Sequence, residues 1–197
     1  MVKRFFDILF SSFGLVVISP FFLIISILIK LNSSGPVFYR QERVGKNRIL
    51  FSVLKFRTMF IDSDKRGLLT VGKRDPRVTT IGYFLRRFKM DELPQLINIF
   101  KGEMSFVGPR PEVEKYVNLY SDEQLKVLSI KPGLTDFASL EYFDENILLA
   151  KSSNPEQTYI QEVMPAKLEL NKKFLQNQSL SLYFYLIFKT VLRVIGL

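Results

Sequence analysis

Residues 5–29 read FFDILFSSFGLVVISPFFLIISILI, and this apolar stretch decides how the chain meets its surroundings. From Ile8 to Ile29 it contains no charged side chain, and a helix of that length, at ~1.5 Å per residue, just crosses a hydrocarbon layer ~30 Å thick. The stretch runs directly into Lys30 without the small-residue cleavage site of a secretory signal peptide. It therefore predicts a membrane helix that stays on the protein.

The middle and the flanks of this stretch argue against a simple span. Ser19-Pro20 lies in the middle, where proline removes a backbone donor and disfavours helical geometry in the residue before it. Lys3 and Arg4 precede the stretch and further basic residues follow it at 30–48, so both flanks satisfy the positive-inside rule on the same side. From these residues a kinked span and a re-entrant hairpin broken at Ser19-Pro20 remain about equally open.

Asp7 shifts this balance slightly toward the hairpin. A carboxylate near the entry point of a membrane helix needs a partner, because an isolated charge is costly in hydrocarbon. Arg4 or a polar surface of the following domain is the expected partner. We therefore group Lys3, Arg4, Asp7, Ser19 and Pro20 as the functional residues of the membrane segment.

Length and composition bound the remainder of the chain. Its 197 residues suffice for one domain, which we place at 33–197 after a membrane segment at 1–32. The net charge of +9 favours anionic partners such as phosphates, nucleic acid or anionic lipid. The absence of Cys and His excludes thiolate catalysis, disulfides, imidazole bases and His/Cys metal sites. Any nucleophile, base or metal ligand must be a carboxylate, hydroxyl, Lys or Tyr.

The local patterns after residue 32 predict an α+β domain that is mainly helical. Residues 37–41 and 49–55 read as the strands of a small hairpin, and 65–77 as a surface loop. Helical patterns follow Thr80 as far as Phe88 and run from Asp91, placed as an N-cap, to Lys101-Gly102. Further helices are expected at 112–120, 122–128 and 156–176. The apolar run 182–197 suits an amphipathic helix lying in a membrane interface.

Asp91-Glu92-Leu93-Pro94 is the first candidate for chemistry. The plain interpretation is a helix start, with Asp91 as the cap, Glu92 in the first turn and a proline that this position accepts. The functional interpretation is that a helix N-terminus also attracts phosphate, which would then lie beside the Asp91 carboxylate. A carboxylate there could attack phosphorus or hold Mg²⁺.

Basic residues accompany this pair in the sequence. Arg86 lies just upstream, and Arg110 stands between two prolines that fix the local backbone. Bidentate binding of a diphosphate is a natural use of such arginines, and Lys55 and Arg57 are weaker candidates for the same anionic surface. The sequence contains no Walker loop, no Rossmann fingerprint and no helix-turn-helix or zinc pattern, so we expect no nucleic-acid partner.

Taken together, these blocks resemble the bacterial sugar transferases, also called monotopic phosphoglycosyl transferases. The resemblance covers the first two thirds of the chain. The matching blocks occur in the family's order: Lys3-Arg4 with Phe6-Asp7, Ser19-Pro20, Gly35-Pro36-Val37-Phe38-Tyr39-Arg40-Gln41, Lys55-Phe56-Arg57-Thr58-Met59, Asp75-Pro76-Arg77-Val78-Thr79, Asp91-Glu92-Leu93-Pro94-Gln95-Leu96, Met104-Ser105-Phe106-Val107-Gly108-Pro109-Arg110-Pro111-Glu112 and Lys131-Pro132-Gly133-Leu134-Thr135.

The resemblance implies a two-step reaction. Asp91 attacks the β-phosphate of a UDP-sugar, UMP leaves, and a phosphosugar-aspartyl intermediate remains. Polyprenol (undecaprenyl) phosphate then takes the phosphosugar to give polyprenol diphospho-sugar, the start of a surface glycan. The resemblance also implies Mg²⁺ held by Asp91 and Glu92, with Glu92 as ligand or base. It implies a re-entrant membrane helix and a catalytic domain on the cytoplasmic face of the bacterial inner membrane.

The chain departs from the common pattern after Thr135. Members often continue Gly-Trp-Ala-Gln, whereas this chain has Asp136-Phe137-Ala138-Ser139. The mechanism therefore carries over better than the identity of the sugar, and the glycan pathway and a homodimer stay open. A membrane-tethered module that binds anionic lipid or nucleic acid without reaction is the alternative from another class. A one-step transferase in which Asp91 only binds metal is the second.

Overall fold

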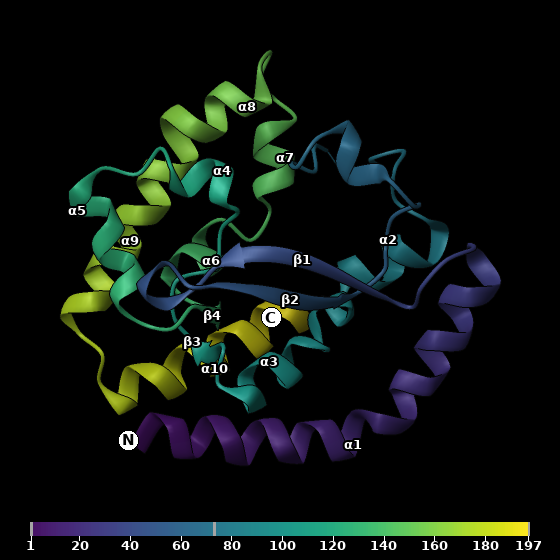
Figure 1. Cartoon of the computed structure of the whole chain (residues 1–197), viewed down its shortest axis with the longest axis horizontal. Helices are drawn as coiled ribbons and strands as arrows, with labels where there is room; N and C mark the ends of the chain where they lie inside the picture. The colour runs from purple at the N-terminus through teal and green to yellow at the C-terminus, as the bar shows by residue number, and fades with distance from the viewer. Residues whose placement is uncertain (1, 73, 197) are drawn as a thin grey trace.

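The computed structural model describes residues 2–72 and 74–196, and the apolar N-terminal stretch forms its longest helix, α1 (Val2–Asn32). At ~1.5 Å per residue α1 is about 46 Å long. In Figure 1 it runs along one edge of the molecule, bends, and continues up the next edge. Within the described residues, α1 is the one helix that is long and apolar enough to cross a membrane. Most of its apolar stretch is not buried by the rest of the protein.

The structure corrects the prediction that the helix is broken at Ser19-Pro20. Pro20 lies inside α1, and the helix continues through it to Asn32. Ser19 Oγ donates a hydrogen bond to the carbonyl of Val16 at 2.8 Å, within its own helix. A membrane helix tolerates proline when nearby groups take up the freed backbone positions, so the segment bends without losing its helical structure.

The predicted β-hairpin follows α1. Strands β1 (Phe38–Val44) and β2 (Leu50–Phe56) pair antiparallel, with Phe38 opposite Phe56 and Val44 opposite Leu50. A 3-10 turn at Lys46–Arg48 joins them. The buried residue Phe56 packs with Ile25 and Ile29 of α1, so the hairpin lies against the second half of the long helix.

The structure also contains a parallel pair of strands that the sequence did not predict. Strands β3 (Ser105–Val107) and β4 (Gly133–Thr135) pair parallel, with Ser105 opposite Gly133 and Val107 opposite Thr135. Each is only three residues long. A Cβ on Gly133 would lie 2.1 Å from the backbone nitrogen of Gly108, so this close approach needs glycine. The pair fixes the backbone that leads into Pro109-Arg110-Pro111.

Helices surround the two sheets, as Figure 1 shows. They are α2 (Thr80–Arg87), α3 (Gln95–Lys101), α4 (Glu114–Val117), α5 (Asp122–Leu125), α6 (Phe137–Glu141), α7 (Glu145–Leu149), α8 (Pro155–Thr158), α9 (Met164–Gln176) and α10 (Leu180–Ile195). Short 3-10 turns at Ser63–Arg66, Met90–Glu92 and Lys126–Ser129 and a π-helical turn at Tyr159–Val163 complete the regular structure of the described residues.

Most of the predicted helices are present with shifted ends. The expected helix at 112–120 shrinks to α4, and the expected loop at 65–77 contains the end of a 3-10 turn, with residue 73 outside the described residues. The run predicted at 182–197 begins two residues earlier, because the Ser179 side chain accepts from the backbone N–H of Leu182. Its last residue, 197, lies outside the described residues. The mainly helical α+β class is confirmed.

Polar contacts fasten the first turns of α1 to the domain. Asp7 is 3% exposed, and its Oδ1 accepts from Ser105 Oγ at 2.9 Å, the Phe106 N–H at 3.1 Å and the Tyr183 hydroxyl at 2.9 Å. The partner of Asp7 is thus a polar domain surface and not Arg4. Arg4 instead donates to the carbonyl of Ile99 at 2.5 Å, at the end of α3. Lys3 lies over the ring of Phe174, 5.7 Å from its centroid.

We expect Asp7→Ala to lower the free energy of unfolding by about 2–4 kcal/mol, because buried donors on β3 and α10 lose their common acceptor. Asp7→Asn, which keeps one amide oxygen, should lose less. Ser19→Ala, which removes an exposed hydroxyl bonded within its own helix, is the control and should stay within ~0.5 kcal/mol. Unfolding in detergent micelles measures all three, and an Asp7→Ala protein as stable as Ser19→Ala would contradict the proposed fastening.

Candidate active site

The carboxylate pair Asp91 and Glu92 lies on a 3-10 turn, Met90–Glu92, between α2 and α3. The prediction that Asp91 is a helix N-cap is wrong. The turn itself is preceded by Lys89 in the left-handed region, with φ of 53°, and α3 begins only at Gln95. Pro94 has no N–H to donate to the carbonyl of Met90, so the α-helical bonding pattern starts after it. Asp91 is left free of a capping role.

Glu92 is held by two cations from distant parts of the chain. Its Oε1 accepts from Lys55 Nζ of β2 at 3.3 Å and from Arg110 Nη2, and its Oε2 accepts from Arg110 Nη1 at 3.1 Å. Burial alone would raise the pKa of Glu92, but the charges of Arg110 and Lys55 and the hydrogen bond from Arg110 outweigh it. The pKa of Glu92 is therefore held well below its ordinary value, and the side chain stays ionised.

Asp91 is in the opposite situation. It is 7% exposed, and its Oδ1 is buried with no hydrogen-bond partner. Burial, and then the neighbouring charge of Glu92, raise the pKa of Asp91, while Lys55 and Arg86 act in the other direction. In this pair, Glu92 is an ionised carboxylate whose charge is balanced by two cations, and Asp91 is a carboxylate with one oxygen that has no hydrogen-bond partner.

Arg86 is held in place from the last turn of α2. Its Nε donates to Thr58 Oγ1 at 2.8 Å and its Nη1 donates to Thr70 Oγ1 at 3.1 Å. Both partners are neutral hydroxyls, and none of the described carboxylates forms a salt bridge with Arg86. Its positive charge lowers the pKa of Asp91. The guanidinium is therefore fixed in direction and retains its charge for an anion.

Arg110 is positioned through its backbone. Its N–H donates to Asp136 Oδ2 at 3.3 Å, and Asp136 Oδ1 in turn accepts from the N–H of Ser139 at the start of α6. Burial raises the pKa of Asp136, against the opposing hydrogen bonds from Ser139. Asp136, which the sequence marked only as a departure from a common pattern, thus supports the arginine that neutralises Glu92.

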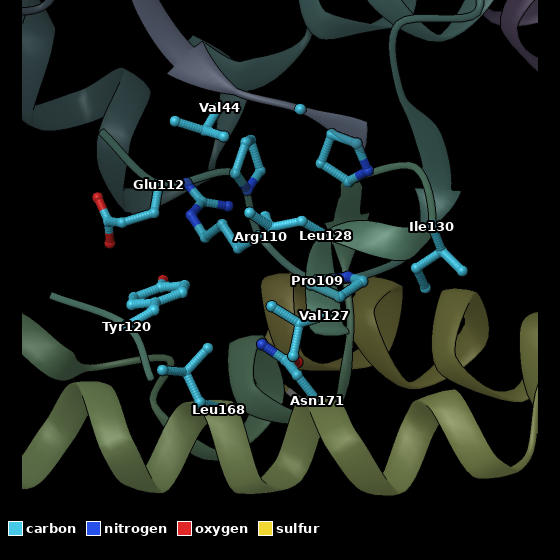
Figure 2. A pocket seen from close by; sticks show the side chains of 13 residues that line it. Val44, Pro109, Arg110, Glu112, Tyr120, Val127, Leu128, Ile130, Leu168 and Asn171 are labelled. Atoms are coloured by element: carbon cyan, nitrogen blue, oxygen red, sulfur yellow. The ribbon is translucent and has the colours of Figure 1, made fainter. Parts of the chain in front are cut away.

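A small cavity lies behind Arg110. Figure 2 shows Arg110 and Glu112 on one side of it, while Leu168 and Asn171 point toward it from α9. Its volume of about 20 Å³ suits a single water molecule. Asn171 is 5% exposed and its Oδ1 is buried without a partner, as expected of a group that bonds to an enclosed water.

A much larger cleft, of about 1530 Å³, opens in front of the carboxylate pair. Five of the charged residues on its lining are predicted site residues, namely Lys55, Arg86, Asp91, Glu92 and Arg110. They come from β2, the end of α2, the 3-10 turn and the segment after β3. Cations thus surround an underbonded carboxylate in a space large enough for a substrate, which suits a phosphate-bearing ligand.

Arg57 is not brought to this group. It is 5% exposed, and its guanidinium donates to the carbonyl of Ser33 at 2.7 Å and to that of Ser34. These carbonyls directly follow α1, so Arg57 fixes the chain where it leaves this helix. Its predicted binding of phosphate has no support in this geometry, because its end nitrogens are already used.

Glu112, at the end of the block around Arg110, is not among the predicted site residues. Glu112 Oε1 accepts from Arg43 Nη1 at 2.9 Å, and its Oε2 accepts from the Tyr159 hydroxyl. Burial and the Glu112 charge raise the pKa of Tyr159. All of these residues line the cleft. No sequence pattern indicated Arg43 or Tyr159, because these residues come together at Glu112 only in the folded protein.

A divalent cation would rely on few protein ligands. The described residues contain no group of three or more carboxylates that could hold one. Mg²⁺, however, is commonly bound by one or two carboxylates together with substrate phosphates and water. The buried, unpartnered Oδ1 of Asp91 fits that mode, with Glu92 as the neighbouring ligand.

The chain is similar in sequence to a family of sugar transferases and to several known bacterial proteins. A family model described as bacterial sugar transferase matches residues 1–196. The exopolysaccharide production protein ExoY of Rhizobium meliloti is 36% identical over 97% of this chain and 84% of its own length. A UDP-N-acetylgalactosamine-undecaprenyl-phosphate N-acetylgalactosaminephosphotransferase of Aeromonas hydrophila is 34% identical over 96% of this chain but 43% of its own. A UDP-glucose:undecaprenyl-phosphate glucose-1-phosphate transferase of Escherichia coli is 40% identical over 71% and 31%.

Replacing each carboxylate by the corresponding amide should change the stability of the protein in opposite directions. Because the pKa of Asp91 is raised, its ionised form costs stability above the ordinary carboxyl pKa. We therefore expect Asp91→Asn to raise the melting temperature at pH 7, with the gain vanishing as the pH falls below that ordinary value. Glu92, whose pKa is depressed, contributes stability above the ordinary pKa that is lost as pH falls through the depressed one. Glu92→Gln should lower the free energy of unfolding by about 3–5 kcal/mol at pH 7, because it leaves buried cations without their partner.

Thermal unfolding across pH 4 to 8 measures both effects. Equal destabilisation by both substitutions at pH 7 would show that the two carboxylates are not divided in this way.

Proposed function

The chain belongs to the bacterial sugar transferase family, and from this we propose that it transfers a sugar 1-phosphate from a UDP-sugar to polyprenol (undecaprenyl) phosphate. UMP is released, and the polyprenol diphospho-sugar begins a surface glycan. The observation that carries the proposal is the unpartnered Oδ1 of Asp91, buried among cations on a large cleft. The named activities of the Aeromonas and Escherichia relatives support the two substrates.

In the first step Asp91 acts as the nucleophile. Its Oδ1 bonds to the β-phosphorus of the UDP-sugar while the bond from that phosphorus to the oxygen bridging the two phosphates breaks. The electron pair of the broken bond leaves with UMP, and a phosphosugar-aspartyl intermediate remains. Arg86 and Lys55 lie where they can stabilise the charge that builds on the phosphoryl oxygens.

In the second step an oxygen of polyprenol phosphate bonds to the same phosphorus, and the bond to Asp91 breaks to regenerate the carboxylate. This acceptor needs little help from a base, because a phosphate is already ionised near neutral pH. The depressed pKa of Glu92 also argues against a base at that position. We therefore assign Glu92 the role of holding Arg110 and Lys55, and of a metal ligand, in preference to that of a base.

Mg²⁺, held by Asp91 and Glu92, would neutralise charge on the substrate phosphates when bound. The rest of the work falls to the chain's own groups. Arg110 is fixed by Glu92 and Asp136, and Arg86 by Thr58 and Thr70. A cleft lined by rigidly held cations can orient a diphosphate without reorganising as the reaction proceeds.

We place residues 1–32 in the membrane and 33–197 on its cytoplasmic face. The exposed side of α1 is apolar on both halves, with Phe13 at 68% and Leu23 at 65% exposure. The bend at Pro20 and the basic flanks support a re-entrant helix in the bacterial inner membrane. Such a helix returns both ends to one face, where a soluble sugar nucleotide and a lipid phosphate meet.

Asp91→Asn should abolish UMP release and the covalent adduct, because the amide cannot act as the nucleophile. Purified protein is incubated with UDP-sugars, Mg²⁺ and polyprenol phosphate, and UMP is quantified. Intact mass spectrometry without acceptor tests for a phosphosugar on Asp91. Flotation with liposomes should show unchanged membrane binding. Turnover at the wild-type rate in this variant would exclude the mechanism.

The same assay separates the alternatives. Wild-type UMP release that always requires the acceptor, with no adduct on Asp91, would indicate a one-step transferase. If no UDP-sugar yields UMP, the protein is instead a binding module without catalytic activity.

The topology can be tested with introduced cysteines, since the chain has none of its own. We expect Val2→Cys and a cysteine at exposed Glu123 to react alike. Both should be protected from a membrane-impermeant maleimide added to intact cells, and both should react after lysis. Labelling of Val2→Cys alone in intact cells would show a full span and overturn the re-entrant assignment, even if the chemistry is right.

A further inference from the structure

Helix α10 has an apolar stripe that the protein does not cover. Phe184, Phe188, Val191 and Ile195 follow one another at helical spacing and therefore lie on one face. They are 37%, 61%, 53% and 62% exposed. A stripe of this kind on a protein surface indicates a partner for it.

The stripe begins at the membrane helix. The Phe184 ring packs edge-on against Phe6 of α1, with 5.0 Å between centroids, and lies 6.2 Å from Phe10. The neighbouring residue, Tyr183, donates to Asp7. The first turns of α10 are therefore fixed to the segment that meets the hydrocarbon.

The stripe ends at the cleft. Val191, Val194 and Ile195 line it, together with Phe88 and Phe143. At ~1.5 Å per residue, the eleven residues of rise from Phe184 to Ile195 carry the stripe about 16 Å along α10, from the contact with α1 to this apolar wall.

Cations join the apolar wall to the carboxylate pair. Lys89 Nζ lies 4.7 Å from the centroid of the Phe143 ring, and the Arg193 guanidinium lies 5.2 Å from the same centroid. Lys89 is two residues from Asp91 in the chain, and its charge acts on the pKa of that carboxyl. The wall thus changes from apolar to cationic next to the proposed nucleophile.

We propose that the apolar wall of Phe88, Phe143, Val191 and Ile195 binds the isoprenoid chain of the lipid phosphate acceptor, with Lys89 at its phosphate. An amphiphile with a long apolar chain and an anionic head matches a surface that is apolar toward α1 and cationic toward Asp91. Contact with bulk lipid alone does not require the stripe to enter the cleft that holds Asp91. This subsite rests on the proposed function and adds to it the path by which the acceptor arrives.

Photocrosslinking tests the subsite directly. The wild-type protein in phospholipid nanodiscs is irradiated with a polyprenyl phosphate that carries a diazirine in the isoprene unit next to the phosphate. Labelled peptides should contain Phe143 or residues 191–195, and unlabelled polyprenyl phosphate should compete. A phospholipid with the diazirine in its acyl chain is the matched probe. Labelling confined to α1, or equal and uncompeted labelling by the phospholipid probe, would overturn the subsite.

Kinetics supply the second test. The double variant Val191→Ser with Ile195→Ser should raise the KM for polyprenyl phosphate about tenfold, while the KM for UDP-sugar and adduct formation without acceptor stay unchanged. Tyr185→Ser, at a residue of α10 that is 50% exposed and not on the cleft lining, is the control. An unchanged KM for polyprenyl phosphate in the double variant overturns the subsite, as does an equal rise in the control. Absence of adduct and UMP in the wild type would instead refute the proposed function.

Discussion

The pairing of Glu92 with Arg110 and Lys55 is the interaction on which the cleft depends. Two neighbouring carboxylates cannot both be buried and ionised without nearby positive charge. Arg110 and Lys55 neutralise Glu92, and the remaining cost falls on Asp91, whose Oδ1 has no partner and whose pKa is raised. A stable fold thereby keeps one carboxylate oxygen uncommitted, at a position where a substrate or a metal ion can satisfy it.

The same pairing explains the arrangement of the surrounding elements. Lys55 requires the hairpin of β1 and β2 to lie beside the 3-10 turn. Arg110 requires the short parallel pair β3 and β4, whose close backbone approach depends on Gly133 and Gly108. Asp136, directly after β4, then fixes the Arg110 backbone. These small strands are therefore essential to the charge balance of the cleft.

The long apolar helix α1 is connected to this arrangement at two points. Arg4 donates to carbonyls at the end of α3, and α3 begins just after the carboxylate pair. Asp7 accepts from Ser105 and Phe106 of β3, the strand that leads to Arg110. The position of α1 and the position of the cleft are therefore mechanically linked. In the function we propose, this linkage holds the nucleophile at a constant height relative to the lipid acceptor.

The sequence by itself determined the features that are local. A charge-free run of residues, the turn residues between two short strands, and the caps and glycines at helix ends specify their structure without distant partners, and α1, the hairpin, α2 and α10 formed where expected. The blocks around Asp91 and Arg110 also identified the carboxylate pair of the cleft and the arginine that binds Glu92. Tertiary structure decided the rest, because it depends on groups far apart in the chain. It turned Asp91 from a helix cap into a buried, unpartnered carboxylate, assigned Arg57 to the end of α1, and paired Asp7 with Ser105 and Tyr183. Burial and charge are set by neighbours in space, and no spacing along the chain specifies them.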